Sequence, residues 1–148
     1  MLRIHKHWLP VVLWMGFIFV LSTSLGSAEH TSMIIEPLLR WLNPDISPEN
    51  IDLVHTLVRK GGHLTEYAIL ALLTLRATSI SLRTGQTGGW YKAAGIALLV
   101  AAAYAATDEW HQSFVPGRTA SVYDVTIDTS GAFIALIVAA AWRKLRTR

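Results

Sequence analysis

The sequence predicts an all-α membrane protein, a four-helix transmembrane bundle with a short interfacial amphipathic helix between its first and second crossings. The chain of 148 residues is 52% hydrophobic and 16% charged, which is too apolar for an ordinary soluble domain. Four apolar windows approach the roughly 20 helical residues that a bilayer core of about 30 Å requires. Tryptophans stand at the window ends, where indole rings favour the headgroup region. They are Trp8, Trp90, Trp110 and Trp142.

The four windows define the expected crossings of a single domain that covers residues 1–148. They span roughly residues 8–25, 63–82, 91–110 and 122–142. The second window is interrupted by three ionisable residues, His63, Glu66 and Arg76, although Glu66 lies near one end. The first window has an alternative interpretation as a secretory signal, since basic residues precede it and Gly26-Ser27-Ala28 resembles a cleavage site. We expect this segment to be retained as a crossing.

The connection between the first two windows contains signals for helical structure. Ser47 is a good helix cap, with Pro48 in the first turn. Apolar residues then recur at helical spacing, which predicts an outer amphipathic helix over roughly residues 48–60. We expect Gly61-Gly62 to break this helix. An earlier apolar stretch predicts a short interfacial piece that is interrupted at Pro37.

The distribution of charge predicts the orientation. The N-terminus, the second connection and the C-terminal tail contain Lys and Arg but no acid, while all ten acids lie in or beside the other two connections. The chain should therefore be a multi-pass protein of the cytoplasmic (inner) membrane with both termini inside. The net charge of +3 reflects this orientation, so we expect no nucleic-acid partner. The absence of cysteine excludes disulfides and thiolate ligands.

Polar side chains gather at the predicted outer ends of three crossings. They are Lys60, His63, Glu66 and Tyr67 on the second, Asp108, Glu109 and Gln112 on the third, and Arg118, Asp124 and Asp128 on the fourth. Spacings of three or four residues within each set place pairs on one helix face. Ionisable groups at the edge of a bilayer cost free energy unless they pair, meet water or act on something. The sequence therefore predicts a polar pocket that faces outward.

Several of these residues also have structural interpretations. Asp124 follows Ser121 by three residues, as in a helix-start capping pair. Arg118 would anchor a turn by pairing with Asp108 or Glu109. Both interpretations compete with a role in ligand binding.

Among the other predicted site residues, Lys60 and Tyr67 have structural interpretations, whereas Glu66 and Asp128 are harder to explain in this way. Lys60 has the alternative of extending its ammonium group to lipid headgroups, and Tyr67 that of packing at the interface. Glu66 and Asp128 each lie inside an apolar run, where an unpaired carboxylate is costly. These two acids therefore need partners or water.

Three motifs resemble the VanZ-like family of small bacterial membrane proteins. They are Lys60-Gly61-Gly62-His63-Leu64-Thr65-Glu66-Tyr67, the stretch from Thr107-Asp108-Glu109-Trp110 to Pro116-Gly117-Arg118, and Asp124-Val125-Thr126-Ile127-Asp128-Thr129-Ser130-Gly131. The motifs occur in the family's order. Asp128 departs from the family pattern, which often has Asn there. The resemblance implies an association with glycopeptide antibiotic resistance, in particular low-level teicoplanin resistance.

One hypothesis is that the pocket binds an amphiphilic cell-envelope ligand among the membrane lipids. The ligand would be a lipid-linked wall precursor, a phospholipid or a lipoglycopeptide. Arg118 and Lys60 would meet its phosphate or carboxylate, while Trp110 and Phe114 contact its apolar part. The candidate ligand-binding residues are Lys60, Tyr67, Gln112, Arg118, Asp124 and Asp128.

A second hypothesis is an intramembrane hydrolase or transferase that acts on a lipid or lipid-linked phosphate. Its candidate catalytic residues are His63, Glu66, Asp108 and Glu109, and the same four with Asp128 would bind a divalent cation if one is used. Carboxylates with one imidazole suit Mg, Mn or Zn. A third hypothesis is a structural polar network without ligand, with Arg118 paired to Glu109, His63 paired to Asp128 and no cavity. Alanine-rich stretches allow close helix contacts, within one copy or in a homo-oligomer.

Overall fold

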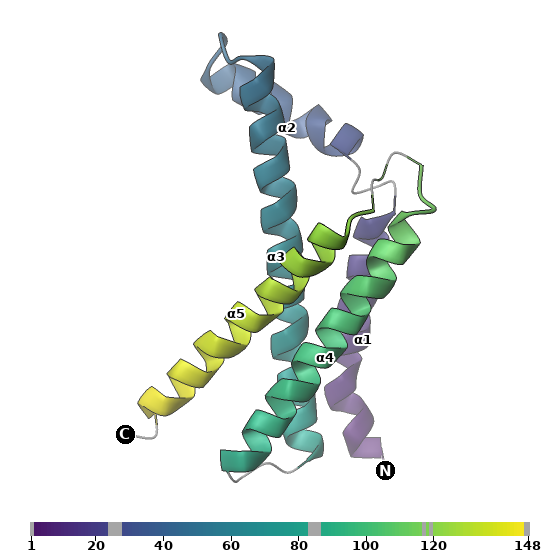
Figure 1. Ribbon diagram of the computed structural model, residues 1–148, viewed down its shortest axis with the longest axis vertical. Helices are drawn as coiled ribbons and strands as arrows, with labels where there is room; N and C mark the ends of the chain where they lie inside the picture. The colour runs from purple at the N-terminus through teal and green to yellow at the C-terminus, as the bar shows by residue number, and fades with distance from the viewer. Residues whose placement is uncertain (1, 24–27, 83–86, 117, 119, 147–148) are drawn as a thin grey trace.

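The computed structural model describes residues 2–23, 28–82, 87–116, 118 and 120–146, and within them it contains five α-helices and no strand. The helices are α1 (Leu2–Ser22), α2 (Ala28–Leu42), α3 (Pro48–Ser81), α4 (Thr87–Gln112) and α5 (Val122–Arg146). Helix α3 contacts each of the other four, and its contact with α5 is the most extensive (Figure 1). The predicted all-α class is confirmed.

Helix α3 is one continuous helix of 34 residues. It begins as predicted, with the Ser47 hydroxyl accepting a hydrogen bond from the Asn50 backbone N–H and Pro48 in the first turn. The prediction of a break at Gly61-Gly62 was wrong, because both glycines are helical. A helical glycine costs at most about 1 kcal/mol relative to alanine, which tertiary packing readily offsets. The amphipathic segment 48–60 and the window 63–82 thus form one rod roughly 50 Å long.

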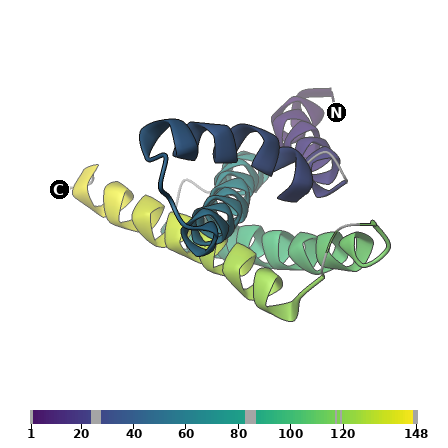
Figure 2. The ribbon, with the colours of Figure 1, turned by 90° about the horizontal axis from the view of Figure 1, so that it is seen from above.

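Helix α2 is also continuous, with Pro37 inside it, so the expected interruption is not found. It lies across the N-terminal end of α3, beyond the other helices (Figures 1 and 2), and α3 is the one helix of the described chain that it contacts. Many of its apolar side chains stay exposed. They are Met33, Ile34, Leu38, Trp41 and Leu42.

Two helices of the described chain are long and apolar enough to cross a membrane, judged by length and composition. They are Gly89–Gln112 and Val122–Arg146, which cover the windows predicted at 91–110 and 122–142. The apolar part of α1, Lys6–Ser22, is shorter, and the predicted end of the first window at residue 25 lies outside the described residues. Crossings by α1 and α3 stay predictions.

Small residues allow the helices to pack closely. Helix α4 buries an alanine on every turn along one side, at Ala93, Ala97, Ala101 and Ala105, and such stripes allow close helix approach. On α5, Gly131 lies so close to α3 that an added Cβ would collide with the backbone carbonyl of Leu64. This tight contact brings the polar segments of α3 and α5 together.

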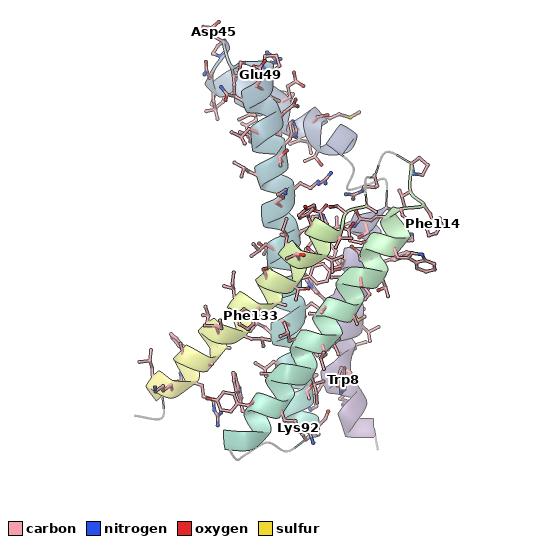
Figure 3. The ribbon with its side chains drawn as sticks, viewed as in Figure 1. Trp8, Asp45, Glu49, Lys92, Phe114 and Phe133 are labelled. Carbon is pink, nitrogen blue, oxygen red and sulfur yellow. The ribbon has the colours of Figure 1, made fainter. Side chains whose placement is uncertain are left out.

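The ends of the bundle differ in charge. Figure 1 shows both termini at the end where α3 finishes and α4 begins. Trp8 and Lys92 lie toward this end in Figure 3, whereas Asp45 and Glu49 lie at the far end of α3.

The Trp8 indole N–H donates to Ser81 Oγ at 3.1 Å, which ties the start of α1 to the end of α3.

Candidate functional site

Asp108 is the centre of a buried hydrogen-bond network at the end of α4. Its side chain accepts hydrogen bonds from Ser22 Oγ at 2.5 Å and from Gln112 Nε2 at 2.9 Å. All three residues are buried, and the bond to Gln112 confirms that these two residues share a helix face. Ser22 was not among the predicted site residues, although it ties the end of α1 to α4.

Arg118 stabilises the C-terminal end of α1 rather than pairing directly with Asp108 or Glu109. Its guanidinium group donates to the backbone carbonyls of Leu21 and Thr23, with Nη2 3.1 Å from the Thr23 oxygen. The last carbonyls of a helix lack donors within the helix and carry partial negative charge, which explains why a guanidinium group is stable there. Burial, and then the nearby positive charge of Arg59, lower the pKa of Arg118 from its ordinary value.

Glu109 holds the start of α5. Its Oε2 accepts a hydrogen bond from the Ser121 backbone N–H at 2.8 Å, and the Ser121 hydroxyl accepts one from the Tyr123 N–H at 3.1 Å. Ser121 is thus a helix cap as predicted, but the reciprocal carboxylate comes from α4 and not from Asp124. Asp124 instead pairs with Arg59, with Oδ2 3.5 Å from Nη2.

His63, Glu109 and Asp128 come together from three different helices. His63 Nδ1 is 3.2 Å from Asp128 Oδ1, and each of the three residues offers a potential ligand atom within 4.8 Å of the others. Glu66 and Asp108, the other two predicted cation ligands, are not part of this group. The structure therefore brings together three of the five residues predicted for a cation site.

An open pocket of about 130 Å³ lies beside this group. It is lined by Leu21, Ser22, Thr31, Arg59, Gly62, His63, Glu66, Gln112 and Arg118. Of the six predicted ligand-binding residues, only Gln112 and Arg118 are in this lining. Lys60 is exposed on α3 and Tyr67 is fully buried in the core. Asp124 pairs with Arg59, and Asp128 belongs to the buried group. The predicted gathering of polar faces is thus found, with Arg59 in the place expected for Lys60.

Arg59 is a site residue that the sequence analysis missed. It precedes His63 by four residues, so both side chains lie on one face of a continuous helix. The expected break at Gly61-Gly62 hid this relationship, because it separated Arg59 from the helix that carries His63. The signal that identifies Arg59 is its helical spacing from His63, if the helix is continued through both glycines.

A larger hollow of about 570 Å³ lies at the other end of the bundle. Its lining includes Trp90, Tyr91, Arg143 and Lys144. These residues are aromatic and basic, and the described lining contains no carboxylate or imidazole. The smaller pocket is therefore the better candidate for a site, since its lining combines one acid, one histidine and two guanidinium groups.

Comparison with known proteins identifies one family. The family model described as VanZ/LLP1 matches residues 7–143, which is nearly the whole chain and includes every residue of the site. No curated protein and no solved structure gives a significant match.

Proposed function

The chain belongs to the VanZ/LLP1 family, and we propose that it is a membrane protein whose pocket holds the anionic group of an amphiphilic cell-envelope ligand. The ligand class is a lipid-linked wall precursor, a phospholipid or a lipoglycopeptide. The observation that carries this proposal is that two guanidinium groups, Arg59 and Arg118, line one small pocket.

Two guanidinium groups and one carboxylate, that of Glu66, line the pocket, so the lining carries one more positive than negative charge, which favours an anion. Arg59 and Arg118 line the same pocket, so their positive charges repel each other. A phosphate or carboxylate between them removes this repulsion and accepts the guanidinium N–H groups that Asp124 and the carbonyls of α1 leave available. Asp124 and the end of α1 already hold the two side chains in position, which lowers the entropy lost on binding.

The size of the pocket limits what it holds. Its volume of about 130 Å³ is well below the roughly 300–1,000 Å³ of pockets that enclose a whole drug-sized ligand. The pocket therefore holds a headgroup, and the apolar chain of the ligand lies outside. Trp110 and Phe114, each 70% exposed and in edge-to-face contact with each other, offer an apolar surface at the same end of α4.

The membrane arrangement that suits this function has four crossings, by α1, α3, α4 and α5. Both termini face the cytoplasm and the pocket faces outward, toward the outer leaflet of the inner membrane. The end with Lys92 and the two termini is the basic one, as the positive-inside rule requires. Because α3 is longer than the bilayer core is thick, its first half projects beyond the membrane and carries α2.

A second candidate function is an intramembrane hydrolase or transferase on the same class of ligand. One observation favours it, namely that His63 belongs both to the pocket and to the group with Glu109 and Asp128. A purely structural network is less well supported, although one pairing that it predicts is found, since His63 Nδ1 lies 3.2 Å from Asp128 Oδ1. Such a network pairs all of its members, whereas this region has a pocket and buried carboxylate oxygens without hydrogen-bond partners.

The proposal is tested by lipid binding to the purified chain in nanodiscs. A polyprenyl phosphate and a phosphatidate serve as anionic probes, and a phosphatidylcholine serves as the zwitterionic reference, with native mass spectrometry as the readout. We expect preferential binding of an anionic probe that weakens at least tenfold in Arg118→Ala and in Arg59→Ala, since each loses a charge-assisted pair of hydrogen bonds. The matched control is Arg40→Ala, because Arg40 is exposed on α2 and pairs with Glu36.

Three further results would separate the hypotheses. Equal binding by wild type, Arg118→Ala and Arg59→Ala would contradict the proposal. Chemical conversion of a bound probe by wild type but not by His63→Ala would support the hypothesis of a hydrolase or transferase. In cells, a gain in teicoplanin resistance that is lost in Arg118→Ala at equal membrane levels would connect the pocket with the resistance that the family resemblance implies.

A further inference from the structure

The group formed by His63, Glu109 and Asp128 is almost closed to solvent. The Asp128 side chain is inaccessible, Glu109 is 5% exposed and the His63 side chain is 12% exposed. The three residues come from α3, α4 and α5, so the group lies where the three helices meet. Two buried carboxylates this close to each other require compensating positive charge.

The hydrogen bonds of the group are incomplete. Both Asp128 carboxylate oxygens, Glu109 Oε1 and His63 Nδ1 are buried without a hydrogen-bond partner among the described residues, although His63 Nδ1 lies 3.2 Å from Asp128. A buried carboxylate oxygen that lacks a partner is costly. The nearby Asp108 shows the contrast, since both of its oxygens accept hydrogen bonds. His63 forms an ion pair with Asp128 Oδ1 when its imidazole is protonated. Asp128 Oδ2 and Glu109 Oε1 remain as buried carboxylate oxygens without a partner among the described residues, and they point to a further positive charge.

We propose that His63, Glu109 and Asp128 bind one divalent cation of the type of Mn²⁺ or Zn²⁺. One imidazole with two carboxylates suits these ions, because Mg²⁺ and Ca²⁺ prefer ligand sets made of oxygen alone. Ligand atoms about 2.1 Å from one ion lie roughly 3–3.5 Å apart, and the separation of His63 from Asp128 already has this value. Glu109 has one oxygen fixed by Ser121 and presents the other to the ion.

The cation would connect the buried group with the pocket. His63 belongs to both, and three protein ligands leave a coordination position for water or a ligand oxygen. That an anionic headgroup fills this position rests on the proposed function. Binding of the cation itself does not depend on it, so the two proposals can fail separately.

Metal binding to the full-length chain tests the proposal. The detergent-solubilised protein is stripped with a chelator and titrated with Mn²⁺, with the electron paramagnetic resonance signal of free Mn²⁺ as the readout, and Zn²⁺ is tested by competition. We expect one ion per chain, and at least tenfold weaker binding in Glu109→Gln and in Asp128→Asn. The matched control is Glu36→Gln, which removes an exposed acid of α2 that pairs with Arg40 and should keep wild-type affinity.

A second readout separates loss of the site from loss of folding. The cation should raise the thermal midpoint of wild type and of Glu36→Gln, but not that of Asp128→Asn, whose helical circular dichroism should remain intact because the change removes a buried charge. Arg118→Ala should lose the anionic lipid and still bind the cation. The inference would be overturned if wild type bound no Mn²⁺ or Zn²⁺, or if Glu109→Gln and Asp128→Asn bound them as wild type does.

Discussion

Asp108 and Asp128 are two buried carboxylates that the fold stabilises in different ways. Asp108 accepts hydrogen bonds from Ser22 and Gln112, whereas Asp128 has His63 at 3.2 Å and no hydrogen bond of its own. The sequence predicts both acids as site residues from their position in or beside apolar runs. It does not predict this difference, because the donor from Ser22 comes from a helix 86 residues away that no local spacing relates to Asp108.

The network at Asp108 leads to a prediction for Ser22. Ser22→Ala removes one of two donors to a buried carboxylate, and we expect the free energy of unfolding to fall by about 1–3 kcal/mol. Thermal or denaturant unfolding of the purified protein in detergent measures this change. The control is Ser113→Ala, since the exposed Ser113 hydroxyl only donates to the backbone carbonyl of Trp110. Equal stability of the two variants would show that Ser22 does not support Asp108.

At the scale of helices, the sequence predicts where most elements lie but not where two of them join. Cap chemistry at Ser47 and hydrophobic spacing predict helix over residues 48–60 and 63–82, and α3 covers both ranges as far as Ser81. The continuity of α3 is not predicted, because two adjacent glycines indicate the end of a helix when only the sequence is considered. The cost of a helical glycine is small, and the tertiary structure overrides this local preference. A Cβ added at Gly61 or Gly62 would meet nothing within 4 Å, so neither glycine is required there by close contact.

Gly131 is different, because close contact with α3 does require it. We expect Gly131→Ala to lower the free energy of unfolding by about 1–3 kcal/mol, the usual cost of overpacking, since the new Cβ collides with backbone that cannot rotate away. The measurement is the unfolding midpoint in detergent. Gly95→Ala is the matched control, because nothing lies within 4 Å of an added Cβ there and alanine favours the helix. If both variants were as stable as wild type, the close crossing of α3 and α5 would be refuted.

At the scale of the whole molecule, the site forms because three polar helix segments meet at one level of the bundle. Helical periodicity predicts the polar faces, and alternation of the crossings predicts that they lie on one side. The partners of Arg118 and Glu109 are not predicted, since they depend on the path of the connection after α4, which has no periodicity. In the structure this connection brings Arg118 to the carbonyls of Leu21 and Thr23. It also brings the Ser121 backbone N–H to Glu109.

The proposed orientation is testable because the chain contains no cysteine, so a single introduced thiol reports its own side of the membrane. Asp45 and Lys92 are both exposed and lie toward opposite ends of the molecule (Figure 3). We expect a membrane-impermeant maleimide to label Asp45→Cys in spheroplasts, and Lys92→Cys only after the membrane is opened, because basic connections stay in the cytoplasm. Labelling of both thiols in sealed cells would refute a membrane crossing by α3, which lies between the two positions, and the reverse pattern would place the pocket on the cytoplasmic side.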